Sequence, residues 1–163
     1  MPTPTPLAMH RFAASLIMAA LAGCAEMPAP SPAAQVSPAA QQPGSARALA
    51  VARLQAIAQG DIEAIQRGYA DDAILQWVGG PLDGVYQGRA QLAAPWQRFA
   101  AAQGVLHATF GASSESANPR GATVITPVIF VGQGGTIKVR HVVVIRGGQV
   151  VDEIWQVDPA LTL

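Results

Sequence analysis

The spacing of apolar residues predicts three helices ahead of a run of strands. One face of the first helix carries residues three or four positions apart: Leu49, Ala50, Arg53, Leu54, Ile57 and Ala58. Gly60 ends this helix, and Asp61 offers an N-cap to a short second helix. A third helix is expected over 88–102, where Trp96 and Phe99 share one face.

Apolar and polar residues alternate after Gly104, as is typical of strands. A short strand over 73–78 precedes the third helix, and four strands are expected over 105–114, 122–132, 136–146 and 149–158. The glycines at 134–135 and 147–148 suit hairpin turns, and Pro127 predicts a bulge or bend. Helices followed by antiparallel strands indicate an α+β domain whose sheet curls around the helices.

The N-terminus has the pattern of a secretory leader that ends in a lipid attachment site. A basic segment over 1–11 is followed by the apolar stretch 12–22, which is about half the ~20 residues needed to span a bilayer. The run Leu21-Ala22-Gly23-Cys24 resembles a bacterial lipobox, so residues 1–23 are expected to be removed and Cys24 to carry lipid. An ordinary signal peptide or an uncleaved anchor remains the alternative.

Residues 24–45 are expected to tether the domain 46–163 to a membrane. This stretch consists largely of Pro, Ala, Gln and Ser, and such compositions stay disordered. Resemblance to bacterial lipoproteins implies diacylglycerol and an amide-linked chain, including palmitate, and two or more chains anchor stably. Ala25 favours the outer membrane, with the domain facing the periplasm of the cell envelope. A linear recognition motif for a partner is the alternative for this segment.

Composition excludes several classes of function. Cys24 is the only cysteine, so lipidation leaves no thiol for a disulfide, a nucleophile or a metal site. Loss of Arg11 with the leader leaves nine basic residues against ten acids, which does not suit nucleic acid. Only His107 and His141 remain after cleavage, and their spacing matches no metal site. We therefore expect no cofactor and no metal.

Four motifs in order resemble the NTF2-like superfamily, in particular its SnoaL-like branch. They are Gly60-Asp61-Ile62, Tyr69-Ala70-Asp71-Asp72-Ala73, Gly84-Val85-Tyr86-Gln87-Gly88-Arg89 and Arg146-Gly147-Gly148-Gln149-Val150. The resemblance implies a cone in which three N-terminal helices pack on a strongly curved antiparallel sheet around an apolar cavity. It also implies a homodimer formed through the outer face of the sheet.

The family includes isomerases, dehydratases, epoxide hydrolases and polyketide cyclases, and also proteins that only bind, so the fold alone cannot decide. Trp77 stands where ketosteroid isomerases have a catalytic aspartate, and Arg53 where they have an oxyanion-hole tyrosine. SnoaL-like cyclases have an acid after the last-strand tryptophan, whereas Gln156 follows Trp155 here. These replacements argue against the enzymatic functions of the family.

A two-residue turn at 147–148 predicts the faces of the last two strands. The cavity face would carry Val139, His141, Val143, Val150, Asp152, Ile154 and Gln156. The outer face would carry Lys138, Arg140, Val142, Val144, Glu153, Trp155 and Val157. A turn longer by one residue would instead place Glu153 and Trp155 beside His141.

These faces give candidate site residues. His141 with Asp152 could act as a general base and its orienting acid, and the alternative is a structural His141. The expected pocket residues are Trp77, Tyr86, Trp96, Phe110, Ile154 and Gln156. Arg140, Glu153 and Trp155 are expected on the dimer face.

The sequence favours a membrane-tethered domain that binds a small apolar ligand or an envelope protein. The alternative is a cofactor-independent lyase, isomerase or hydrolase that uses the pair of His141 and Asp152. A dimeric assembly factor would require neither residue and would depend on Trp155.

Overall fold

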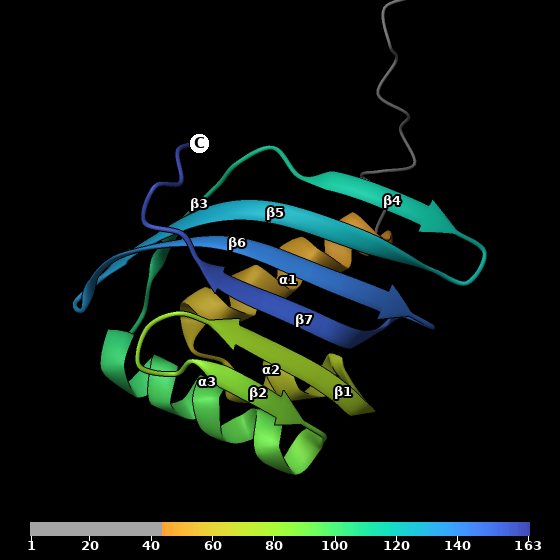
Figure 1. Ribbon diagram of the computed structural model, residues 1–163, viewed down its shortest axis with the longest axis horizontal. Helices are drawn as coiled ribbons and strands as arrows, with labels where there is room; N and C mark the ends of the chain where they lie inside the picture. Colours follow the sequence, from red (N-terminus) through yellow and green to blue (C-terminus); the bar gives the residue numbers. More distant parts are fainter. Residues whose placement is uncertain (1–43) are drawn as a thin grey trace, which may run out of the picture. The chain divides into compact units, whose positions relative to one another are not determined.

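The computed structural model describes residues 44–163 as helices followed by a curved sheet (Figure 1). The predicted leader, the predicted lipid attachment site at Cys24 and most of the predicted tether lie outside these residues. The helices are α1 (Ala46–Gln59), α2 (Ile62–Arg67) and α3 (Arg89–Gln103). The strands are β1 (Tyr69–Val78), β2 (Gly84–Gln87), β3 (His107–Phe110), β4 (Ser114–Asn118), β5 (Gly121–Gly132), β6 (Gly135–Arg146) and β7 (Gln149–Val157). Among the described helices, none is long and apolar enough to cross a membrane.

The ends of the first two helices follow the expected capping chemistry. The side chain of Ser45 accepts a hydrogen bond from the Ala48 amide at 3.2 Å, which caps α1. Gly60 ends α1 with a φ of 69°, a left-handed conformation that glycine adopts without strain. The carboxylate of Asp61 then accepts from the Ala64 amide at 2.9 Å and begins α2.

The sheet has the order β2-β1-β7-β6-β5-β3, and β4 also pairs with β5. The predicted α+β fold is therefore confirmed, but the sheet is mixed rather than antiparallel throughout, because β1 and β7 pair in parallel. No hairpin joins these two strands. The chain crosses over through α3 and the other strands before it returns beside β1, and parallel pairs require such a crossover.

Pro127 does not disturb the pairing of β5 with β6, where it lies opposite Arg140 without a register shift. The irregularity lies on the other side of β5. The predicted strand over 105–114 is broken into β3 and β4, and the Gly111 amide donates to the Pro127 carbonyl at 2.8 Å in the gap. The proline, which lacks an amide hydrogen, thus faces the edge where the neighbouring strand is interrupted.

The helices cover one face of the sheet, and Figure 1 shows α1 behind β5, β6 and β7. Helix α3 packs against β1 and β2. Large side chains from α1 and α3, including Leu54, Ile57 and Leu92, are buried against this inner face. The opposite face of the sheet carries no helix of the described region.

Candidate functional site

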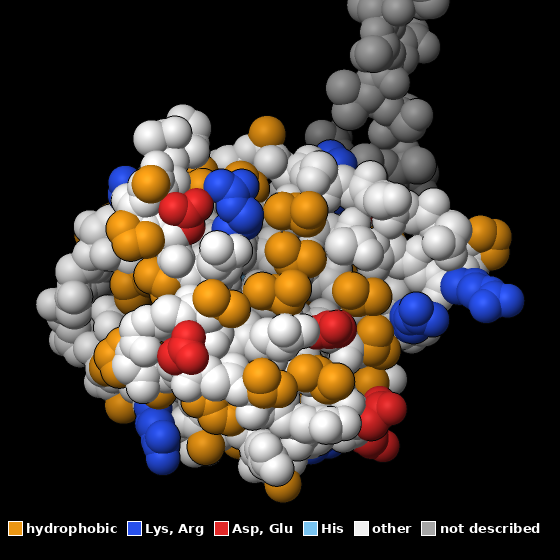
Figure 2. Space-filling model, in the orientation of Figure 1, with side chains coloured by type: hydrophobic (Ala, Val, Ile, Leu, Met, Phe, Trp, Pro, Cys, Tyr) orange, Lys and Arg blue, Asp and Glu red, His pale blue; other side chains and the backbone are white. Residues whose placement is uncertain are grey.

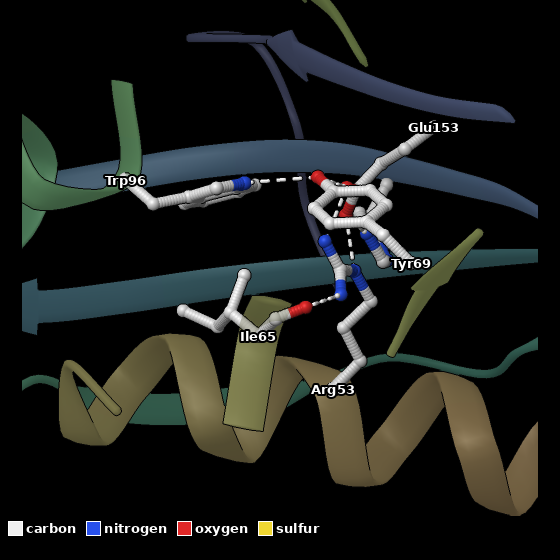
Figure 3. A network of polar contacts seen from close by, with 6 residues as sticks. Arg53, Ile65, Tyr69, Trp96 and Glu153 are labelled. Atoms are coloured by element: carbon white, nitrogen blue, oxygen red, sulfur yellow. Dashed lines mark hydrogen bonds and ion pairs between the residues drawn. The ribbon is translucent and has the colours of Figure 1, made fainter. Parts of the chain in front are cut away.

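Arg53 of α1 and Glu153 of β7 form an ion pair inside the domain (Figure 3). The Nε of Arg53 donates to Oε1 of Glu153 over 2.8 Å, and Nη2 donates to Oε2 over 2.6 Å. The side chain of Glu153 is 0% exposed and that of Arg53 is 4% exposed. A two-pronged pair of this kind is stronger and more directional than a single hydrogen bond. It joins the first helix to the last strand.

A backbone carbonyl and neighbouring side chains make further contacts with this pair. Nη1 of Arg53 donates to the Ile65 carbonyl at 3.0 Å, and its guanidinium carbon lies 4.0 Å from the centre of the Tyr69 ring. Tyr69 donates its hydroxyl to Glu153 and accepts a hydrogen bond from Nε1 of Trp96 at 2.9 Å. We refer to these side chains and a histidine as the buried polar cluster: Arg53, Tyr69, Trp96, His141 and Glu153.

The charges in the buried polar cluster hold one another ionised. Burial alone would raise the pKa of Glu153, but the charge of Arg53 and hydrogen bonds from His141 and Arg53 hold that pKa well below its usual range. Burial alone would lower the pKa of Arg53, and Glu153 and Tyr69 raise it above its usual value. Burial and the nearby carboxylate raise the pKa of Tyr69, so its phenol stays protonated and donates.

His141 of β6 is the remaining member of the cluster. Its Nε2 lies 2.6 Å from Oε1 of Glu153, and the ionised carboxylate can only accept, so Nε2 carries the proton. Its Nδ1 is buried without a hydrogen-bond partner among the described residues. A carboxylate on one nitrogen and a free second nitrogen would suit a general base. His141 is 0% exposed, however, so a substrate cannot reach that nitrogen in this structure.

A β-bulge at Val151 decides which side chains of β7 face the helices. The turn has the expected two residues, with Arg146 opposite Gln149. The register then shifts, so that Val144 pairs with Asp152 and Val151 is an extra residue on β7. Because side chains alternate along a strand, one extra residue exchanges the faces of everything that follows.

The predicted faces of the rest of β7 are therefore wrong. His141 lies opposite Trp155, and both Glu153 and Trp155 are fully buried rather than on an outer dimer face. Asp152 is not the partner of His141, because its Oδ1 lies 3.5 Å from Nε2 of Gln76 on the other face of the sheet. The alternative arrangement, with Glu153 and Trp155 beside His141, is formed through a bulge instead of a longer turn.

Two predicted pocket residues are placed on the outer face by the same shift. Ile154 is half-buried and Gln156 is exposed on this side, so neither lines the interior. Arg140 is exposed, as expected for an outer residue, but its partner is Asp158 at 3.1 Å rather than Glu153.

An aromatic cluster lies beside the buried polar cluster. Trp77, Trp96, Phe99 and Trp155 all contact one another, with ring centres between 5.1 and 6.1 Å apart. Trp155 also stacks on Phe130, with ring centres 5.5 Å apart. The replacement of an acid by Trp77, noted from the sequence, thus places an aromatic ring in the interior.

A pocket of about 360 Å³ opens next to these rings, between α3, the loop after β1 and the ends of β6 and β7. We call it the apolar pocket, and it is lined by Trp77, Gly79, Gly80, Pro81, Leu82, Arg98, Phe99, Ala102, Gln103, Ile137, Trp155 and Val157. Arg98 is exposed and is the one ionisable residue among them. Pockets of this size and composition suit small apolar ligands.

The other predicted pocket residues lie near this pocket or away from it. Trp96 belongs to the aromatic cluster, and its N–H is used by Tyr69. Tyr86 is half-buried and donates its hydroxyl to the carbonyl of Leu82, a lining residue, at 2.8 Å. Phe110 packs on the core from β3 and does not line the pocket.

The sequence did contain a signal for the missed ion pair. Arg53 stands on the apolar face of the first helix, at the spacing of Ala50 and Ile57, where a charge needs a buried partner. The partner could not be identified because the two-residue turn placed Glu153 on the wrong face.

Solved structures with the same fold define the class of protein. An NTF2-like protein of unknown function from Pseudomonas putida KT2440 superposes with a TM-score of 0.58 at 23% identity, covering 68% of this chain and 82% of that one. A ketosteroid isomerase-like protein from Erwinia carotovora atroseptica SCRI1043 gives 0.55 at 19% identity, covering 68% and 91%. An NTF2-like protein from Burkholderia xenovorans LB400 gives 0.53 at 20% identity, covering 72% and 85%. The domain has the NTF2-like fold.

The family follows from the sequence match. Residues 50–153 match the SnoaL-like domain, and the chain belongs to that family. No curated protein matches the chain.

The two interior regions differ in what they can do chemically. The buried polar cluster holds charged and ionisable groups, but its Tyr69, His141 and Glu153 do not line the apolar pocket. The pocket has room for a ligand but holds no acid or histidine that could move a proton.

Proposed function

We propose that this protein binds a small, largely apolar molecule in the apolar pocket without transforming it. The observation that carries the proposal is a pocket lined by Trp77, Phe99 and Trp155 whose one ionisable side chain is Arg98. Flat apolar ligands stack favourably on such rings. An anionic group on the ligand would lie near the guanidinium of Arg98 at the exposed rim.

The enzymatic alternative from the sequence loses its chemical basis in this geometry. It required His141 and Asp152 to work as a pair, and Asp152 lies on the outer face of the sheet. The group that does contact His141 is Glu153, which is committed to Arg53 and Tyr69. We therefore propose a binding domain.

The binding test uses the chain from residue 24 onward with Cys24→Ser and the probe 1-anilinonaphthalene-8-sulfonate, a flat aromatic sulfonate. Binding at one hundred times the dissociation constant should stabilise the fold by about 2.7 kcal/mol. Trp77 and Trp155 line the pocket, so their fluorescence gives a second readout.

A matched pair of variants assigns the binding to the pocket. Ala102→Phe places a large side chain in the lining, whereas Ala101→Phe makes the same change at an exposed neighbour that does not line it. We expect Ala102→Phe to abolish probe binding and Ala101→Phe to preserve it. Equal probe binding by both variants would exclude this pocket as the site.

We further propose that Cys24 carries lipid and anchors the protein to the cell envelope, at the outer membrane facing the periplasm. The lipobox-like run Leu21-Ala22-Gly23-Cys24 supports this proposal. The intact mass of protein extracted from membranes should exceed that of the chain from Cys24 by the acyl groups. Cys24→Ser should release the protein into the soluble fraction, and an unchanged distribution would contradict the anchor.

We also propose that the outer face of the sheet forms a homodimer. The side chains there that are half-buried or exposed include Ile74, Ile125, Ile129, Val142, Val144 and Ile154. Figure 2 shows hydrophobic side chains spread over this face of the domain, and apolar patches of this kind favour association. Sedimentation should give a dimer for the wild type and a monomer for Ile154→Arg. A monomeric wild type would exclude the proposed homodimer.

A further inference from the structure

A second recess, different in character from the apolar pocket, lies where β4 meets β5 and β6 ends. It measures about 220 Å³ and is lined on the outer side of the sheet by Ser116, Asn118, Arg120, Thr123, Val144 and Arg146 among others. The strand pairing places Ser116 opposite Thr123, and Thr123 opposite Val144, so these side chains share one face. Its lining includes two arginines and no acid. We call it the arginine recess.

The two arginines of this recess have no acidic partner. Five other arginines of the described region form ion pairs: Arg47 with Glu115, Arg53 with Glu153, Arg67 with Glu63, Arg89 with Asp71, and Arg140 with Asp158. Lys138 donates to the Leu161 carbonyl. Within residues 44–163, three arginine side chains have neither an ion pair nor a hydrogen bond: Arg98, Arg120 and Arg146. Two of them, Arg120 and Arg146, line this recess.

A glycine permits the close approach of the first residue of β5 to the end of β6. A Cβ on Gly121 would lie 2.4 Å from the Ile145 carbonyl oxygen and 3.0 Å from Cγ of Arg146, and the residue has a φ of 152°. The stem of Arg146 thus packs over the backbone directly after Arg120. A side chain at position 121 would clash with the Ile145 carbonyl and with the Arg146 stem.

Neutral donors accompany the two charges. The hydroxyls of Ser116 and Thr123 line the same recess. Oδ1 of Asn118 accepts from the Arg120 amide at 2.8 Å, which leaves the Asn118 NH₂ group available as a donor. Guanidinium groups with hydroxyl and amide donors are the chemistry that recognises phosphate oxygens.

The chain enters the described domain at this same end. Gly44 lines an adjoining recess, and Asn118 and Gly121 belong to both. Figure 2 shows Lys and Arg side chains gathered at the end of the sheet where β4 and β6 finish. The tether proposed over residues 24–45 would therefore join the domain beside the arginine recess.

We propose that the arginine recess binds the phosphate groups of anionic phospholipids in that membrane. The choice of a lipid headgroup over free phosphate rests on the tether proposed above, whereas the anion-binding chemistry rests on the residues that line the recess. Bound headgroups would orient the domain at the membrane. The apolar pocket would stay separate from them, because it is lined by other residues.

The test measures sedimentation of the Cys24→Ser chain from residue 24 with phosphatidylcholine vesicles that contain or lack phosphatidylglycerol. Without its own lipid, the chain can bind only through the domain and tether. Each basic residue near an anionic surface adds to the affinity for that surface. Loss of two of them, in Arg120→Gln with Arg146→Gln, should weaken vesicle binding about thirtyfold. Binding should also weaken as salt is raised.

The control removes the same charge elsewhere, through Arg67→Gln with Arg140→Gln, both at exposed ion pairs. We expect this control to bind as the wild type does. Equal loss in both double variants, or no dependence on phosphatidylglycerol, would overturn the proposal. Binding of inorganic phosphate without vesicle binding would overturn the choice of a lipid.

The same double variant separates this proposal from the proposed ligand binding. Arg120 and Arg146 lie outside the apolar pocket. The double variant should therefore bind 1-anilinonaphthalene-8-sulfonate as tightly as the wild type does. The unfolding midpoint of the variant should also be unchanged, because both side chains are exposed and make no hydrogen bond in the fold.

Discussion

The interior of this domain differs on the two sides of Trp155. Towards His141, whose ring centre lies 5.9 Å away, the space is filled by charged groups that satisfy one another. Towards Trp77, the same indole borders about 360 Å³ of unfilled apolar space. The comparison shows that ionisable groups at the centre of such a fold can serve packing, while the pocket that could hold a ligand has one ionisable lining residue, Arg98, and it is exposed.

The largest effect is expected from breaking the ion pair on the polar side. Glu153→Gln leaves the buried charge of Arg53 without its counter-ion, which should lower the free energy of unfolding by about 3–5 kcal/mol. Urea denaturation measures this loss. Asp152→Asn is the matched control, because the same type of change is made one residue away on the outer face.

The double replacement Arg53→Met with Glu153→Leu sharpens the result. Removing both charges should recover most of the lost stability, since a buried pair is costly to desolvate. A Glu153→Gln variant as stable as Asp152→Asn would contradict a structural role for the polar side.

The ion pair also predicts a dependence on acid. The pKa of Glu153 is held below its ordinary value of 4.5 in the folded protein, so from that value downwards the unfolded chain binds more protons. The stabilisation is present above 4.5 and is lost as the pH falls towards the folded pKa. Urea midpoints measured between about pH 6 and pH 3 should fall less steeply when both charges are removed.

A smaller loss is expected from Tyr69→Phe. The change removes the hydroxyl that donates to Glu153 and leaves the N–H of Trp96 without an acceptor, which should cost about 1–3 kcal/mol. Tyr86→Phe removes a half-buried hydroxyl with one carbonyl partner and should cost about 1 kcal/mol at most. Thermal unfolding measures both losses of stability. Equal losses for Tyr69→Phe and Tyr86→Phe would contradict tighter coupling of the hydroxyl in the buried polar cluster.

The smallest effect is expected on the apolar side. Ile137→Val removes a methyl group that borders unfilled space, so its cost should lie near the lower end of the usual range, about 0.5 kcal/mol. Ile57→Val, in the packed core at 1% exposure, should cost up to about 1.5 kcal/mol. Equal costs would indicate that Ile137 is packed as tightly as the core.

Much of the fold could be predicted from local chemistry. Gly60 and Asp61 mark the boundary between α1 and α2, and the two-residue turn at 147–148 is formed as expected. These signals are short-range, because each depends on the backbone conformation of a few adjacent residues. The parallel pairing of β1 with β7 depends on contacts between distant segments, and no local pattern encodes it.

The candidate site could be predicted only in part, for the same reason. Trp77 was expected at the pocket and lines it. The partner of His141 was missed because the extra residue Val151 lies inside a strand, where Val150 and Val151 fit either face. Arg53 was the clearer indication of a buried ion pair, because an arginine on a buried helix face requires an acid in the core.

The bulge at Val151 has a consequence for how homologous proteins are aligned. A chain that lacked the extra residue would keep the hairpin but show Asp152 and Ile154 to the helices, so a single deletion would replace the interior chemistry of the last strand. Alignment columns counted from the turn would then equate inward with outward positions. Functional residues on this strand are therefore best transferred between homologues by counting from the bulge.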